Sequence, residues 1–303
     1  MSQEGDDRPR PPVKLPSGRA TIWRLRTRTL ALPRRPLLMG IVNVTPDSFS
    51  DGGQFFDAES AVEHALQLVA DGADILDIGG ESTRPHAEPV SEREELSRVM
   101  PVVRRLIDSL EVPISIDTQK ASIALAAIEA GAEIINDVSG LEGDPEMVDV
   151  AVATGAGICA MHMQGTPQTM QDNPTYSDVL REVHDYLRER RDALVVAGVE
   201  RERICLDPGL GFGKASEHSL TLMSHCYMLH DLACPILVGP SRKSFLGKLP
   251  GDDQTDRTSD TIGAALRLSA QGVQILRVHD VRQVRQALQE VEATDAKDAR
   301  FDA

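Results

Sequence analysis

The sequence predicts a single α/β domain of the TIM (β/α)8 barrel class. Eight short apolar runs rich in β-branched residues, typical of buried strands, alternate with segments whose apolar residues have helical spacing. Eight such units need about 250 residues, and the chain has 303. A doubly wound parallel sheet is the alternative. It normally has fewer strands and carries G-x-G-x-x-G after the first one, where this chain reads NVTPDSFSDGG.

The expected elements follow one another in a regular order. Strands are expected at 37–42, 75–79, 113–117, 133–137, 157–162, 204–208, 235–239 and 274–279. Helical spacing marks 58–73, 92–110, 122–132 and 261–272, and several of these segments end in Gly, as a helix C-cap often does. Before the first strand, residues 21–32 alternate like a short hairpin. The expected division is a flexible N-terminal segment (1–20), the barrel (21–291) and a flexible acidic tail (292–303).

Composition narrows the class of partner and the compartment. Acidic residues outnumber basic residues by 47 to 32, and the formal charge of −15 argues against a nucleic-acid or anionic-membrane surface. The four cysteines form no C-x-x-C pair, which indicates ordinary thiols in a reducing compartment. No stretch approaches the roughly 18 apolar residues of a membrane span, and the N-terminus lacks the apolar core of a signal peptide. We therefore expect a cytoplasmic protein that binds neither nucleic acid nor membranes.

Polar side chains follow nearly every expected strand. In a barrel of this class, function lies at the carboxyl ends of the strands and in the loops beyond them. In chain order these positions hold Asn43, Glu81, Ser82, Thr83, Arg84, Asp117, Asn136, Asp137, His162, Asp207, Ser241, Arg242, Lys243, Arg277 and His279. For any one of them, such as Asp137, capping of the next helix is the commoner role. A polar group after eight strands in succession indicates a binding site.

Three of these residues suit a flat heterocycle. Asp117, Asn136 and Asp207 follow the third, fourth and sixth strands, and their carboxylate and amide groups can pair with ring N–H and amide edges. The alternative is a buried polar network that only closes the barrel mouth.

Four others suit an anion. Arg84, Lys243, Arg277 and His279 supply hydrogen-bond donors in an otherwise acidic protein, which favours a phosphate or diphosphate ligand. Each alone is more often a surface charge. Arg277 and His279, however, are two residues apart on an extended strand and are expected to point to one anion.

Aromatic residues give a further indication, because only 3% of residues are aromatic. Most phenylalanines lie in expected loops after strands, where a flat ligand could stack on them: Phe49, Phe55, Phe56, Phe212 and Phe245. Packing at a helix start is the alternative for Phe55 and Phe245. Stacking is expected most firmly for Phe212.

Two motifs near these residues do not carry the chemistry they suggest. GLGFGK at 209–214 has the glycines and lysine of a phosphate loop, but its spacing differs from that of a P-loop, and Ala215 stands where Ser or Thr would bind magnesium. Lys243 could form a Schiff base, but it follows Arg242 in a loop and does not lie within an apolar strand.

A family resemblance rests on eight motifs in order. They are LMGIVNVTPDSFSDGG, DIGGESTRP, ISIDTQK, INDVSG, MHMQGTPQTMQ, DPGLGFGK, GPSRKSFLG and LRVHDV, from 38 to 281. This set resembles the dihydropteroate synthase family and covers almost the whole barrel. Members of that family are TIM barrels, commonly homodimers. They join p-aminobenzoate to 6-hydroxymethyl-7,8-dihydropterin diphosphate, forming 7,8-dihydropteroate and pyrophosphate, and sulfonamides compete with the aminobenzoate.

The resemblance implies roles for individual residues. The pterin ring would be held by Asp117, Asn136, Asp207 and Lys243. Asn43 would bind Mg2+, and the diphosphate would be held by Thr83, Arg277 and His279. The aminobenzoate pocket would be shaped by Thr83, Arg84, Pro85, Phe212 and Ser244. Asp51 would face a pterinylmethyl cation, because a stabilised diphosphate can leave before the amine attacks, in an SN1-like step.

One position departs from the family pattern, and two other functions stay open. His86 follows STRP where the family usually has Gly, so the second loop is expected to be stiffer, with activity retained. A pterin-dependent methyltransferase domain would use a similar barrel without the diphosphate-binding donors. A non-catalytic paralogue would bind the pterin without turnover.

Overall fold

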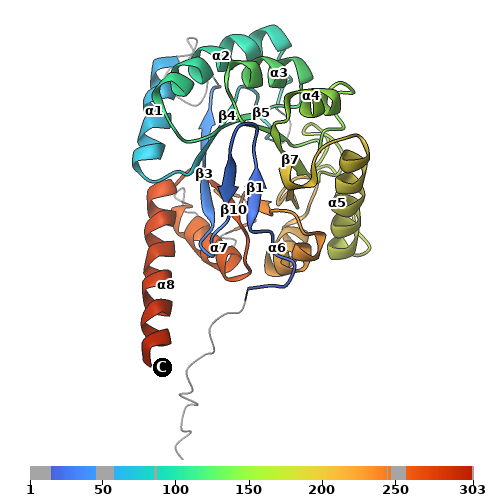
Figure 1. Ribbon diagram of the computed structural model, residues 1–303. Helices are drawn as coiled ribbons and strands as arrows, with labels where there is room; N and C mark the ends of the chain where they lie inside the picture. Colours follow the sequence, from blue (N-terminus) through green and yellow to red (C-terminus); the bar gives the residue numbers. More distant parts are fainter. Residues whose placement is uncertain (1–14, 46–57, 85–86, 244, 247–256, 302–303) are drawn as a thin grey trace, which may run out of the picture.

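The computed structural model describes residues 15–45, 58–84, 87–243, 245–246 and 257–301. Within them, strands and helices alternate around a barrel, as Figure 1 shows. In order the elements are β3 (Leu37–Asn43), α1 (Ala58–Ala70), β4 (Ile75–Gly79), α2 (Glu92–Ser109), β5 (Ile114–Asp117), α3 (Ala121–Ala130), β6 (Ile134–Asp137), α4 (Met147–Thr154), β7 (Gly157–Met161), α5 (Val179–Val196), β8 (Ile204–Asp207), α6 (Ser216–Ser224), β9 (Leu237–Val238), α7 (Thr258–Ala270), β10 (Ile275–Val278) and α8 (Val281–Phe301). The eight barrel strands expected from the sequence are confirmed. None of the helices in this described part is long and apolar enough to span a membrane.

The strands form one parallel sheet that closes on itself. Their order is β8-β7-β6-β5-β4-β3-β10-β9, and a parallel bridge from Leu206 to Ile236 joins its two edges. The Leu206 amide donates to the Pro235 carbonyl at 2.9 Å. β9 is the shortest strand because Pro235 and Pro240 flank it and have no N–H to donate to a neighbouring strand.

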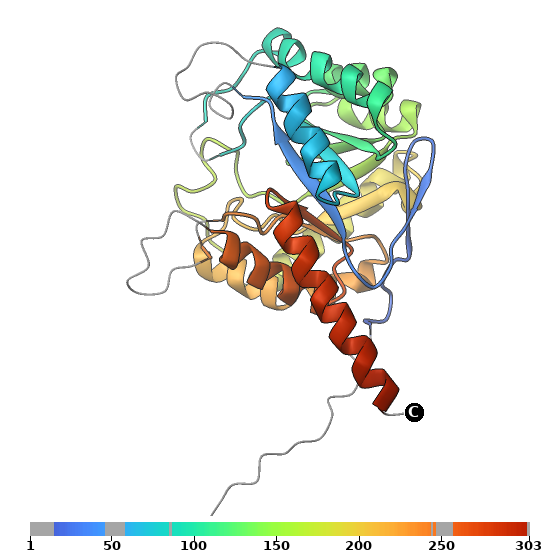
Figure 2. The ribbon, with the colours of Figure 1, turned by 90° about the vertical axis from the view of Figure 1, so that its left-hand side faces the viewer.

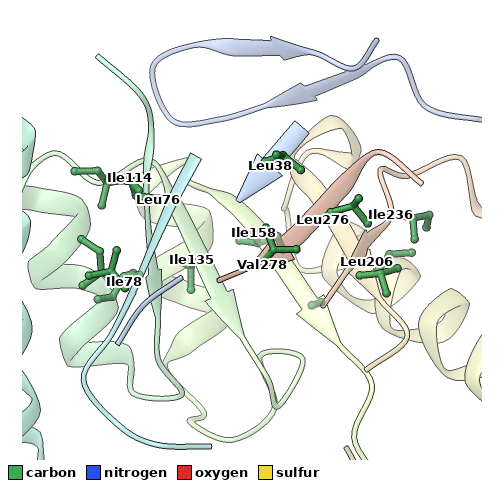
Figure 3. Packing of buried hydrophobic residues seen from close by; sticks show 14 of the residues in the cluster. Leu38, Leu76, Ile78, Ile114, Ile135, Ile158, Leu206, Ile236, Leu276 and Val278 are labelled. Carbon is green, nitrogen blue, oxygen red and sulfur yellow. The ribbon is translucent and has the colours of Figure 1, made fainter. Parts of the chain in front are cut away.

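Alternation along the strands produces two cores. Outward-facing side chains pack beneath the helices, and Figure 3 shows several of them, including Leu76, Ile135 and Leu276. Inward-facing side chains such as Ile75 and Ile134 fill the lower barrel. Neighbours in sequence therefore face opposite sides, which decides which strand-end residues reach the barrel mouth.

An N-terminal hairpin closes the bottom of the barrel, as the alternating sequence predicts. It consists of β1 (Ile22–Arg24) and β2 (Thr29–Ala31), which pair antiparallel. Trp23 is fully buried against the lower core, and its Nε1 donates to the Arg203 carbonyl at 2.9 Å. Buried Glu133 accepts the Thr27 amide at 2.8 Å. The hairpin covers the amino ends of the strands, opposite the carboxyl ends where a ligand is expected to bind.

Parts of the two segments that were expected to be flexible have a described structure. α8 continues through residues 292–301 and extends beyond the barrel, as Figure 2 shows. The physical reason is that this stretch is rich in Ala and charged residues and contains neither Gly nor Pro. Near the other end, Arg19 donates to the carbonyls of Gly272 at 2.8 Å and Leu32 at 3.0 Å, which fixes part of the segment expected to be flexible. Residues 1–14 lie outside the described part.

Candidate active site

The strand-end residues divide between the two faces of the barrel wall. On β6, Asn136 lies on the same face as inward-facing Ile134, whereas Asp137 shares the outer face with Ile135. Asp137 Oδ1 accepts the backbone N–H and the hydroxyl of Ser139, both at 2.7 Å. Asp137 therefore stabilises the turn after β6 and does not cap the next helix, α4, which begins at Met147, and Asn136 faces the barrel interior.

A network of charges forms the floor of the barrel mouth. Arg277 on β10 donates through Nε to Asp77 and through Nη2 to Asp117, each at 2.6 Å. Asn136 donates through Nδ2 to the same Asp77 oxygen at 3.0 Å. Because its nitrogen is committed to Asp77, the amide oxygen of Asn136 remains as an acceptor.

Asp77 is a site residue that the sequence analysis missed. It is fully buried within β4, and its second oxygen has no hydrogen-bond partner among the described residues. Its signal in the sequence is a carboxylate in the middle of the apolar run ILDIG, a position that must be paired to be tolerated.

Burial raises the pKa values of two carboxyl groups in the floor of the barrel mouth. It raises the pKa of Asp117 to about 7, with Arg277 opposing the shift and Asp77, Glu95 and Asp137 adding to it. Asp207 on β8 accepts the Gly209 amide at 2.7 Å, yet burial still raises its pKa to about 6. Both carboxyls are therefore poised between the neutral and charged forms near neutral pH, where ligand N–H donors would favour the charged forms.

Lys243 and Phe212 approach the floor from two loops. The Lys243 Nζ lies 4.2 Å from the centroid of the half-buried Phe212 ring. Burial, followed by the Arg277 cation, lowers the pKa of Lys243 to about 8. Phe245, by contrast, is buried in the outer core and is not placed to stack on a ligand.

A group of cations surrounds a neutral histidine beside the floor. His279 Nδ1 lies 2.9 Å from Ser241 Oγ. Burial, followed by the charges of four nearby cations, lowers the pKa of His279 to about 3; the cations are Arg242, Arg277, Lys243 and Arg84. If Nδ1 accepts the Ser241 hydroxyl, Nε2 carries the proton and can donate. The cations and this donor make the locality suitable for an anion.

The hydrogen bonds of Arg277 are directed at carboxylates in the floor and not at the expected anion position. Its Nε donates to Asp77 and its Nη2 to Asp117. Its pairing with His279 on one anion therefore stays a prediction. The buried-network alternative is partly realised, since Arg277 and Asn136 do join a polar network.

The loop after β4 is tied at both ends. Glu81 accepts the Val90 amide at 2.9 Å and pairs with Lys120 at 2.7 Å. Between these ties, Thr83 is half-buried and Arg84 is exposed. The loop is thus held at its base while Thr83 and Arg84 remain accessible to a ligand.

Several expected site residues cannot be compared with the structure. These lie outside the described residues: Phe49, Asp51, Phe55, Phe56, Pro85, His86 and Ser244. Asn43 ends β3, half-buried at the barrel mouth. Across the described ranges, no group of three or more His, Cys, Asp or Glu residues could hold a metal ion.

Comparisons with known proteins agree with the motifs. A model of the pterin binding enzyme family matches residues 39–279. Dihydropteroate synthase of a Synechocystis species is 46% identical over 249 residues, 82% of this chain and 86% of that protein. The structure of Yersinia pestis dihydropteroate synthase with a sulfonamide drug complex has a TM-score of 0.85 and 43% identity, and the match covers 91% of this chain and 99% of that chain. The structure of Xanthomonas albilineans dihydropteroate synthase with 4-aminobenzoic acid has the same TM-score, identity and coverage.

Proposed function

The chain belongs to the pterin-binding enzyme family, and from that premise we propose that it catalyses the dihydropteroate synthase reaction of folate synthesis. In this reaction p-aminobenzoate joins 6-hydroxymethyl-7,8-dihydropterin diphosphate, and 7,8-dihydropteroate and pyrophosphate are formed. The observation that carries the proposal is a row of acceptors next to a group of cations. Asp117, Asn136 and Asp207 supply the acceptors, and the cations surround His279.

The acceptors suit the polar edge of a dihydropterin. That edge presents an amino group and ring N–H groups, which need carboxylate or amide oxygens opposite them. Ionised Asp117 and Asp207 and the Asn136 amide oxygen are such groups. Lys243, as the only cation of the four proposed ring-binding residues, would donate to a ring acceptor.

The cations suit the diphosphate. Arg277 donates to Asp117 in the floor, and both Arg277 and Lys243 are near enough to His279 to lower its pKa. Positive charge and donors stabilise the charge that develops on a departing diphosphate, which lowers the barrier to carbon–oxygen cleavage. Thr83, from the tied loop, would add a hydroxyl donor at the same place.

Magnesium fits this arrangement with few protein ligands. Mg2+ commonly keeps several waters and binds through substrate phosphates and one or two protein oxygens. The half-buried amide of Asn43 at the end of β3 offers one such oxygen. When bound, the ion would supply charge neutralisation of the diphosphate.

The proposed chemistry is dissociative. The carbon–oxygen bond breaks with its electron pair leaving on pyrophosphate, and a pterinylmethyl cation remains. Asp51 would stabilise this cation, and the aminobenzoate nitrogen then forms the new bond and loses a proton. Because the arylamine needs no strong base, the site requires no nucleophile paired with a histidine and a carboxylate.

The second substrate would bind between two loops. Thr83, Arg84 and Pro85 would form one side, and Phe212 and Ser244 the other. The half-buried Phe212 ring offers a stacking face to a benzoate, and exposed Arg84 offers a donor to its carboxylate.

The test is an assay for both products with purified enzyme, the pterin diphosphate, p-aminobenzoate and Mg2+. The proposal expects pyrophosphate and 7,8-dihydropteroate in equal amounts, with loss of both on chelation of the metal. Pterin binding without pyrophosphate release would contradict it and favour a non-catalytic paralogue.

Asp51→Ala should lower turnover far more than it weakens binding of the pterin diphosphate; equal losses would leave Asp51 with a binding role only.

We also propose a cytoplasmic homodimer. All four cysteines are free and buried, which agrees with a reducing compartment. Exposed apolar side chains support a contact with a second copy: Leu220 on α6, and Tyr227 and Met228 on the short helix η3 (Cys226–Leu232). Sedimentation should give a dimer that Met228→Glu weakens, and a wild-type monomer at assay concentrations would contradict the proposal.

A further inference from the structure

The GLGFGK loop between β8 and α6 has a backbone that only glycine can follow. Gly209, Gly211 and Gly213 have φ of 66°, 78° and 59°. A Cβ on Gly209 would lie 2.0 Å from the His162 carbonyl oxygen, and one on Gly213 would lie 2.3 Å from the Gln164 carbonyl oxygen. The loop therefore rests directly on the backbone that follows β7, with no room for side chains between them.

Lys214 ends this loop with a buried ammonium group. Its side chain is 3% exposed. The Nζ lies 2.8 Å from His162 Nδ1, 2.9 Å from the Phe212 carbonyl oxygen and 3.2 Å from the His162 carbonyl oxygen. These three acceptors match the three N–H donors of an ammonium group.

The surroundings of Lys214 favour this pairing. Burial, and next the Lys214 cation, lower the pKa of His162 to about 3, so its ring is neutral and Nδ1 can accept. Burial lowers the pKa of Lys214 itself to about 7, while Asp207 opposes the shift. Burial of an ammonium group is costly unless hydrogen bonds compensate for the lost water, and three acceptors do so here.

The contacts of Lys214 lead to the proposed substrate site. The carbonyl that it binds belongs to Phe212, and the Phe212 ring faces the Lys243 ammonium at 4.2 Å. At the start of the same loop, the Gly209 amide binds Asp207. The loop that Lys214 holds therefore carries the Phe212 ring, which contacts Lys243, and the Gly209 amide, which contacts Asp207.

We propose that Lys214 is a positioning residue, which fixes the Phe212 ring against Lys243 so that the aromatic face is ready for the aminobenzoate. This inference rests on the proposed function and extends it to a residue that does not touch the substrate. It also gives the GLGFGK motif a physical purpose: the glycines allow the close approach, and the lysine secures it.

Two other contacts hold the same loop and provide a matched control. Tyr176 donates its hydroxyl to the Gly213 carbonyl at 2.7 Å, and Gln171 donates to the Gly211 carbonyl at 2.7 Å. Neither contact involves Phe212. Tyr176→Phe therefore weakens the loop's attachment without freeing the Phe212 carbonyl.

The test is a double-mutant cycle of Lys214→Met and Phe212→Ala, with KM for each substrate, kcat and thermal midpoints. We expect Lys214→Met to raise the KM for p-aminobenzoate by about tenfold or more, because it removes the hydrogen bond from Nζ to the Phe212 carbonyl. In the Phe212→Ala background the same change should have less than about a twofold effect, because the ring it positions is gone. Tyr176→Phe should leave both KM values within about twofold.

Independent, multiplying effects of Lys214→Met and Phe212→Ala would overturn the inference, as would an equal KM change in Tyr176→Phe. If Lys214→Met does not fold, Lys214→Gln replaces it in the same cycle and the same outcomes apply. A wild-type enzyme that forms no dihydropteroate would refute the proposed function. A wild type that turns over with independent effects in the cycle would refute only the role of Lys214.

Discussion

The affinity for the pterin ring should fall steeply as the pH drops below 7. The change is a pH titration from 8 to 5, with unphosphorylated 6-hydroxymethyl-7,8-dihydropterin as ligand so that no phosphate titrates. Asp117 and Asp207 have pKa values of about 7 and 6 in the free protein. Both must be ionised to accept the ring's N–H donors without offering a proton of their own, so binding releases protons and is favoured above pH 7.

The magnitude follows from the two pKa values. A carboxyl that must lose its proton weakens binding about tenfold for each pH unit below its pKa. The dissociation constant should therefore rise about tenfold from pH 7 to 6, mostly because of Asp117, and about fiftyfold from pH 6 to 5, where both carboxyls contribute strongly. The charges that shift the pKa of Asp117 are Arg277, Asp77, Glu95 and Asp137. Arg277 stays charged throughout, so it does not add a step.

Isothermal titration calorimetry with wild type and Asp117→Asn measures these slopes. The variant should bind more weakly at pH 8, retain only about a twofold change between pH 7 and 6, and retain about a fivefold change between pH 6 and 5. An affinity that is flat between pH 7 and 5, or a variant with the wild-type slope, would refute the assignment of Asp117 as an ionised acceptor.

Four further outcomes are expected. Asp77→Asn removes a charged partner of Arg277 worth about 1.5–3 kcal/mol, so kcat/KM for the pterin diphosphate should fall by about 10- to 100-fold; steady-state kinetics within twofold of wild type would contradict this. Asn43→Ala should raise the Mg2+ concentration needed for half-maximal rate while the affinity for the unphosphorylated pterin is unchanged, and an unchanged Mg2+ requirement would count against the metal assignment. Trp23→Ala should lower the free energy of unfolding by about 3–5 kcal/mol, measured in urea, and a loss below about 1 kcal/mol would show that the hairpin does not close the barrel as described. Because Asp117 has a folded-state pKa above its usual 3.8, its contribution to stability is fully present below that value and is lost as pH rises through about 7. Relative to Asp117→Asn, in which this group cannot titrate, the unliganded wild type should therefore lose stability from pH 5 to 8, and a difference between the two proteins that stays constant with pH would oppose this explanation.

The barrel could be predicted because its signals are local. Each strand is a short apolar run, and the 3.6-residue spacing between the runs marks the helices. The position of the candidate site could also be predicted, because parallel strands bring their carboxyl ends to one edge of the sheet. Asn136 and Asp137 show the limit of that reasoning: both end one strand, and only the alternation of faces separates the residue that faces the barrel interior from the residue that stabilises the following turn.

Interactions between distant segments could not be read from the sequence. Arg277 and Asp77 are 200 positions apart, and the sequence around neither residue indicates that the two form an ion pair. Nothing in the GLGFGK motif indicates that Lys214 is buried, because its burial depends on the backbone near His162, which directly follows the preceding strand, β7. α8 continues to Phe301, where the acidic sequence suggested a tail, because residues 292–301 are rich in helix-forming Ala and charged residues.

Asn136 and Asp137 also provide the most direct test of the central claim, that chemistry occurs on the inner face of the strand ends. Asn136→Ala removes an inward acceptor and a partner of Asp77, whereas Asp137→Asn alters the adjacent outward side chain on the same strand. Formation of dihydropteroate, per folded enzyme, should fall by about 10- to 100-fold in kcat/KM for the first variant and by less than about threefold for the second. Equal losses, or a larger loss in Asp137→Asn, would contradict the account.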